Sequence, residues 1–161
     1  MALDVYLTVR TLKGDSVAKG HQDDADVLEF AWGASQSGTT HTGGGGGAGK
    51  ASVQDLSITK YLDSMSVGLE TALFKGSHLA SVVLRSYTPS GGSPVPYLTY
   101  ELSGVIVTSY VIAGSGGEDR LAETVTFNFA KIKISTYKQN PNGTVNAPVS
   151  VTFDVAQNVV S

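Results

Sequence analysis

The sequence predicts a mainly β protein, a barrel or a sandwich, with one helix packed against its outside. Apolar residues alternate with polar ones at a period of two in several segments, and glycine- or proline-rich turns separate these segments. Many strands at regular intervals, with turn signals between them, are typical of barrels and sandwiches. Helical spacing occurs in one segment. The length of 161 residues indicates a single domain over 1–161.

The strand segments follow from this alternation, taken in chain order. The first one carries Leu3, Val5, Leu7 and Val9 on one face. A polar segment follows and predicts a surface loop over 13–26. The expected strands cover residues 3–9, 27–32, 53–58, 78–88, 97–113, 121–137 and 149–155.

A helix is expected over residues 66–75. Its apolar stripe is formed by Met65, Leu69, Ala72 and Leu73. Asp63 or Ser64 is expected to cap its start, because a short side-chain oxygen can accept a free backbone N–H group there. Lys75 suits the negative C-terminal end, and Gly76 provides a left-handed stop.

Two strands carry more apolar residues than a barrel exposed to water needs. Residues 105–112 are apolar on both faces, so the outer face must be covered by the helix or by another subunit. In residues 125–134 the apolar face changes sides. Either a β-bulge lies near Ala130, or the strand crosses from one buried environment to another. The helix is too short to cover all of this surface, which favours an oligomer.

Composition excludes several classes of protein. The net charge is −3 and only 16% of the residues are charged, which argues against nucleic acid as a partner. The absence of cysteine excludes disulfides and thiolate metal sites. The N-terminus lacks the basic and apolar regions of a signal peptide, and no apolar stretch is long enough to span a bilayer. We therefore expect synthesis in the cytoplasm, no membrane insertion and no cleaved export signal.

The glycine run over 43–49, followed by Lys50, contains two nucleotide-binding patterns, G-x-x-x-x-G-K and G-x-G-x-x-G. Both patterns need a strand before the loop and a helix after it, because the helix N-terminus holds the phosphates. A loop precedes this run and an alternating strand follows it. Ala51 also stands where a magnesium-binding hydroxyl is required. The sequence therefore predicts no nucleotide cofactor.

Other candidates for chemistry also have simpler explanations. His21 lies among acidic residues, but the spacing matches no metal signature, and a hydrated acidic loop accounts for it. Glu118, Asp119 and Glu123 could be a general acid and base, although a solvated hairpin end explains them equally well. We expect no catalytic residues, no metal and no enzyme activity.

Several segments in order resemble the haemolysin-coregulated protein family, Hcp. They are the opening MALDVYLTV, the pair Trp32-Gly33, residues 36–38 with the glycine run, SVQDLSITKY over 52–61, FNFAKIK over 127–133 and the Pro-Asn-Gly turn at 141–143. The similarity covers about residues 2–155. It implies a β-barrel of two antiparallel sheets with one helix at its side.

The resemblance also implies a function and partners. Hcp proteins form hexameric rings that stack into the inner tube of the type VI secretion system. The tube carries a spike protein, is driven by a contractile sheath and can hold effector cargo. It is then secreted to the exterior or into a target cell. A ring that binds effectors as a chaperone, without forming long tubes, is the alternative.

The contacts between subunits are expected in two regions. One is the extended glycine-rich loop over 33–50 and the strand after it, which by resemblance reach a neighbouring subunit or ring. The other is the pair of doubly apolar strands. The candidate residues are Gly43, Gly44, Gly45, Gly46, Gly47, Gly49, Lys50, Ser52, Gln54, Asp55, Val105, Val107, Ile132 and Ile134.

Overall fold

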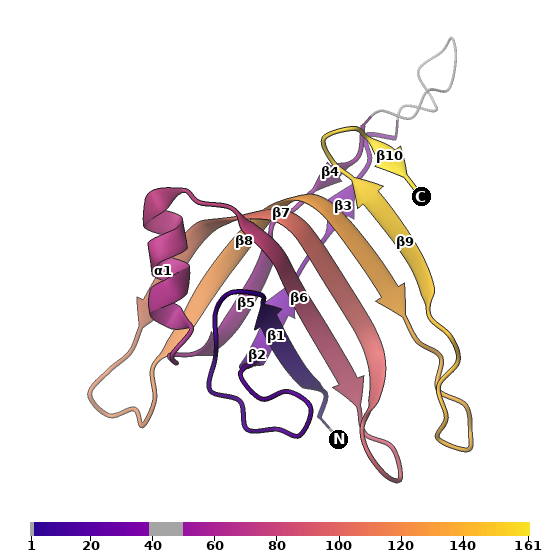
Figure 1. The fold of residues 1–161 in the computed structure, drawn as a ribbon, viewed down its shortest axis with the longest axis horizontal. Helices are drawn as coiled ribbons and strands as arrows, with labels where there is room; N and C mark the ends of the chain where they lie inside the picture. The colour runs from indigo at the N-terminus through magenta and orange to yellow at the C-terminus, as the bar shows by residue number, and fades with distance from the viewer. Residues whose placement is uncertain (1, 39–49) are drawn as a thin grey trace.

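A computed structural model describes residues 2–38 and 50–161 of the chain. It shows a β-barrel with one helix beside it (Figure 1), which confirms the predicted fold class. The elements are β1 (Asp4–Val9), β2 (Ala25–Ala31), β3 (Ala34–Ser35), β4 (Ser52–Val53), β5 (Leu56–Tyr61), α1 (Ser66–Lys75), β6 (Leu79–Thr88), β7 (Val95–Ala113), β8 (Ala122–Thr136), β9 (Val149–Asp154) and β10 (Val159–Val160).

Strand β8 both closes the barrel and extends it. Six strands follow one another in the order β8, β5, β2, β1, β6 and β7, and β7 pairs back with β8. The first half of β8 pairs with β5, from Ala122 to Phe127, and its second half pairs with β9, from Lys131 to Thr136. The sheet is therefore closed along one half of β8 and continues into β9 and β10 along the other. Strands β3 and β4 form a separate two-stranded sheet.

The core lies inside this closed sheet. Because side chains alternate between the faces of a strand, every strand turns one side inward. Val105, Val107, Val125 and Phe127 point into the interior, where they pack with Leu7, Leu56, Ile58 and Leu84. The helix covers one side and buries Leu69 and Ala72 there, and its principal neighbour is β7.

The change of apolar face in β8 does not come from a bulge at Ala130. The pairs Leu102 with Ile132 and Val105 with Phe129 keep the same register across that position. Gly104, which lies opposite Ala130, has a φ of 60°. This left-handed conformation is open to glycine and reorients the strand. At this level β8 passes from the part that pairs with β5 to the part that pairs with β9, as the second alternative predicted.

The helix has the predicted bounds, but a different residue caps its start. Its N-cap residue is Met65, and no side chain bonds to the helix from that position. Asp63 accepts the N–H group of Met65 at 2.9 Å, so it supports the turn before the helix and is not the cap residue itself. Gly76 ends the helix in the left-handed conformation, as predicted. In the described part of the chain, no helix has the length and apolar character that crossing a membrane would require.

Candidate functional site: the assembly surfaces

The base of the glycine-rich loop is a short ladder at one end of the barrel. Ala34 pairs with Val53 and Ser35 with Ser52, and the N–H group of Gln54 donates to the carbonyl of Gly33 at 2.9 Å. The sequence predicted one strand through residues 53–58. The structure instead divides this segment into β4 and β5, which belong to different sheets.

Asp55 attaches this base to the outside of the barrel. Its carboxylate accepts a hydrogen bond from Thr108 at 2.6 Å and one from Asn128 at 2.9 Å. Thr108 lies at the register shift of β7 between Val107 and Ser109, where the extra residue turns toward Asp55. Strands β7 and β8, which are distant from Asp55 in sequence, therefore hold the point from which β4 leaves the barrel.

The structure describes some of the other residues predicted for the loop and leaves the rest outside its described range. Lys50, Ser52 and Gln54 are exposed, so they are available for contact. The candidates Gly43, Gly44, Gly45, Gly46, Gly47 and Gly49 lie outside the described residues. Their predicted role in contact between subunits stays a prediction.

The predicted residues of β7 and β8 do not form an outer surface. Val105, Val107 and Ile132 are buried inside the barrel, and Ile134 is half-buried. The reason is closure: the sheet surrounds an interior, so the chain itself covers one apolar face of each strand. The contact role assigned to these residues is untested, but the first three offer no side-chain surface to a second copy.

A buried ionic cluster fills the barrel beneath the start of α1. Lys60 is fully buried, and its ammonium lies 2.6 Å from Asp63 Oδ1 and 2.6 Å from Glu123 Oε1. Ser66 of the helix donates to the same Glu123 oxygen at 2.7 Å. This corrects the prediction of a solvated hairpin end for Glu123, whose side chain points inward with Val125 and Phe127. The cluster links β5, β8 and α1.

Tyr110 completes the cluster from β7. Its hydroxyl donates to Glu123 Oε2, so both carboxylate oxygens have partners. Burial, and next the hydrogen bond and charge of Glu123, raise the pKa of Tyr110 above its ordinary value of 10.0. The tyrosine therefore stays protonated and acts as a donor. Sequence patterns pointed to none of these contacts, because they depend on which strands become neighbours.

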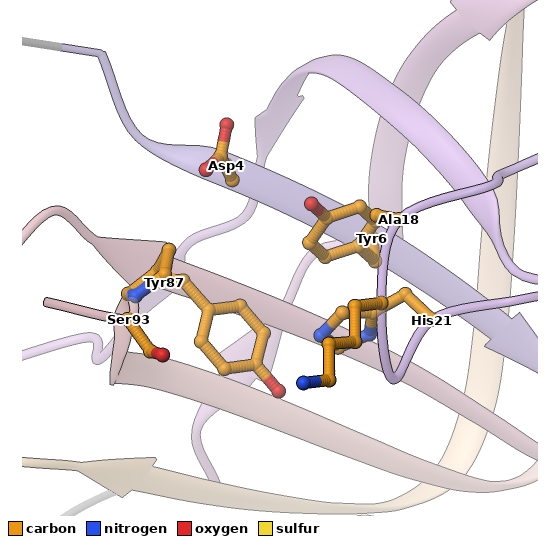
Figure 2. A pocket seen from close by; sticks show the side chains of 8 residues that line it. Asp4, Tyr6, Ala18, His21, Tyr87 and Ser93 are labelled. Carbon is orange, nitrogen blue, oxygen red and sulfur yellow. The ribbon is translucent and has the colours of Figure 1, made fainter.

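His21 lies in an aromatic cluster and not in a hydrated acidic loop. Its ring stacks on Tyr6 at 4.0 Å between centroids and meets the edge of Tyr87 at 4.8 Å. Its Nδ1 atom is 3.1 Å from Asp24 Oδ2, and Thr8 donates to the other oxygen of that carboxylate. Figure 2 shows the rings beside a cavity of about 300 Å³. These contacts pack the loop after β1 onto the barrel.

Metal-ligating side chains do not come together in the part of the chain that the structure describes. No group of three or more histidine, cysteine, aspartate and glutamate residues is close enough there to hold an ion. The contacts of His21 and Glu123 are made within the protein, and they give both residues a structural explanation.

Large exposed apolar side chains occur in elements on two sides of the barrel. The first side, called the helix-side surface below, consists of Leu62, Val67, Phe74, Val111, Ile112 and Leu121. The second, the β9-side surface, consists of Val149, Val151, Val159 and Val160. In Figure 1 the helix lies at the left of the barrel and β9 at its right. Apolar groups gathered on a surface are typical of interaction sites.

Comparisons with known proteins agree with this architecture. Residues 6–136 match the sequence profile of the family described as "Type VI secretion system effector, Hcp". The chain is 43% identical over 160 residues to Protein hcp1 of Pseudomonas aeruginosa, and the match covers 99% of each chain.

Solved structures give the same result. A type six secretion system protein superposes with a TM-score of 0.92 at 29% identity, covering 99% of this chain and 100% of that one. Hcp1 from Salmonella typhimurium superposes with a TM-score of 0.80 at 27% identity over the whole of both chains. The barrel, its helix and the sequence match together show that this chain belongs to the Hcp family of the type VI secretion system.

Proposed function

We propose that the chain is a structural subunit of the inner tube of the type VI secretion system. Six copies close into a ring, rings stack into a tube, and the tube is secreted to the exterior or into a target cell. The observation that supports assembly is the set of large apolar residues exposed on two sides of the barrel, most of all Phe74, which is 81% exposed. Family membership provides the setting for this assembly.

The chain contributes a scaffold and not a reaction. The buried charged groups Lys60 and Glu123 bond to each other and to Asp63, Ser66 and Tyr110, so they serve stability. The spike protein, the contractile sheath and effector cargo are the further partners that this role requires.

Light scattering and electron microscopy of the purified protein test the proposal. We expect a particle of about six times the mass of one chain, seen as rings in micrographs. A strict monomer at micromolar concentration would contradict the proposal. Cross-links between ring faces, formed in cells that assemble the machine, would distinguish a tube subunit from a ring that only holds cargo.

A further inference from the structure

The turn between β8 and β9 belongs to neither the helix-side surface nor the β9-side surface. It lies within residues 137–148 and extends away from the barrel (Figure 1). Gln139 forms an isolated bridge with Val145, and the N–H group of Asn140 donates to the carbonyl of Thr144 at 2.8 Å. These contacts join the two arms of the turn, so the residues at its tip are held in a defined conformation.

At this tip, the side chain of Asn142 bonds back to the chain. Its Oδ1 atom accepts the N–H group of Thr144 at 3.1 Å and the hydroxyl of the same residue at 2.6 Å. A side-chain oxygen that bonds to the backbone two residues further on forms an Asx turn. The amide carbon of Asn142 is therefore folded toward the intervening backbone nitrogen, which belongs to Gly143.

The same two hydrogen bonds make the amide carbon of Asn142 more electrophilic. Donors that point at a carbonyl oxygen stabilise the negative charge that develops there when a nucleophile attacks the carbon. Thr144 supplies both of these donors. The turn thus prepares an acceptor for attack, and the nearest backbone nucleophile along the chain is the nitrogen of Gly143.

Gly143 leaves this nitrogen open to react. Its φ is 86°, a conformation that favours glycine, and no heavy atom of the described residues, apart from its chain neighbours, lies within 4 Å of the position that a Cβ would occupy. One contact restrains the nitrogen, because its N–H group donates to the carbonyl of Asn140 at 2.9 Å. The reaction must break this bond and remove the proton, so it should be faster in alkaline solution.

We propose that Asn142 is a site of spontaneous deamidation, with water as the only co-reactant. The Gly143 nitrogen loses its proton and forms a bond to Cγ of Asn142, and the side-chain nitrogen leaves as ammonia. Water then opens the resulting succinimide ring, at one carbonyl to aspartate and at the other to isoaspartate. One neutral amide becomes one carboxylate, so the formal net charge of the chain changes from −3 to −4.

The two products differ in their effect on the turn. Aspartate keeps an oxygen where Oδ1 stands, so it still accepts both donors of Thr144. Isoaspartate inserts one carbon into the backbone, which is incompatible with the hydrogen bond from Gly143 to Asn140. The first product therefore adds only a charge, while the second also opens the tip.

The other four asparagines lack this combination. Each of them precedes a residue with a side chain, which crowds the attacking nitrogen, and Asn140 precedes a proline, whose nitrogen carries no hydrogen to lose. They are Asn128, Asn140, Asn146 and Asn158. Deamidation should therefore begin at Asn142.

Peptide mapping by mass spectrometry measures the modification. No lysine or arginine follows Lys138, so trypsin releases residues 139–161 as one peptide that carries four of the five asparagines. After incubation of the folded chain, Asn142 should gain the mass that the exchange of an amide for a carboxylate produces, before any other asparagine and faster at higher pH. No gain at Asn142, or an earlier gain elsewhere, would overturn the inference.

Variants of the turn separate the chemistry from its structural support. Asn142→Gln keeps an amide but needs a larger ring, so isoelectric focusing should show no early acidic band for this variant. Thr144→Val removes the hydroxyl donor and should slow the gain in mass, while Thr144→Ser should restore the rate of the wild type. A monomer and a ring can both be mapped, so failure of this inference would leave the proposed function standing. Equal rates in Thr144→Val and the wild type would overturn the role given to the turn.

Discussion

At the scale of single residues, the fully buried Lys60 shows how charge is accommodated in the barrel. A lysine ammonium removed from water costs several kcal/mol unless anions and acceptors surround it. Lys60 has two carboxylates, from Asp63 and Glu123, and the carbonyl of Tyr61 at 3.1 Å. The second carboxylate is in turn bonded by Ser66 and Tyr110. Each charge in the cluster therefore depends on the others.

The substitution Glu123→Gln should lower the free energy of unfolding by about 3 kcal/mol, since it removes one partner of a buried charge pair. Urea unfolding followed by circular dichroism measures the change. Glu118→Gln, in the exposed hairpin, is the control and should change stability by less than about 0.5 kcal/mol. Equal effects of the two substitutions would mean that the cluster does not stabilise the fold.

Because Tyr110 belongs to this cluster, we expect the stability of the fold to depend on pH in the alkaline range. The folded state raises the pKa of Tyr110 above 10.0, so its contribution to stability is complete below pH 10 and is lost as the pH rises further. The free energy of unfolding should therefore fall above pH 10, and Tyr110→Phe should make this fall shallower. Tyr97→Phe, at an exposed position of β7, is the control. If both variants keep the slope of the wild type, Tyr110 is not the titrating group.

At the scale of the elements, Asp55 determines how firmly the ladder of β3 and β4 is held. Its carboxylate makes the hydrogen bonds that join this ladder to Thr108 and Asn128. Asp55→Ala should speed hydrogen exchange in residues 52–53, because the base can then open locally while the barrel stays closed.

Mass spectrometry of exchanged peptides measures this effect, with peptides from β6 as the internal reference. Thr108→Val should give a smaller change in the same direction, because it removes one of the two bonds. Faster exchange throughout the barrel would contradict a local role for Asp55.

The elements themselves could largely be predicted from the sequence. The helix over 66–75 has the predicted bounds, and the long strands β6, β7 and β8 end within two residues of their predicted limits. A strict period of two over ten or more residues leaves few alternatives. The short strands β3 and β10 were not predicted, because two residues carry no periodicity.

The contacts between elements could not be predicted in the same way. Glu123 follows a glycine-rich turn, which locally indicates a solvated end, yet the pairing of β8 with β5 places it opposite Lys60 inside the barrel. Val105 and Ile132 were assigned to an outer surface for a related reason. Period two identifies two faces of a strand, but only closure of the sheet decides which one is inside.

At the scale of the whole molecule, closure pairs most of the strand edges of the barrel, and the edge of β9 between Val149 and Val151 is one that no described strand pairs with. A closed sheet offers few free backbone groups, so association must use side-chain surfaces and that remaining edge. In the proposed ring, any change on one chain is repeated on every copy. A single substitution at a contact between copies should therefore change assembly more than it changes the stability of one chain.

This repetition gives a prediction for the glycine-rich loop, which by family resemblance is expected to reach a neighbouring subunit or ring. Gly45→Asp adds one negative charge per chain, and in the proposed ring every copy carries this charge, so that copies in contact through the loop would repel one another. Tubes in micrographs should become shorter and rarer, while the mass of the single ring by light scattering stays the same. Gly45→Ala is the matched control, because it removes the glycine without adding charge. If Gly45→Asp dissolves the ring itself, the loop acts between neighbours within one ring and not between rings.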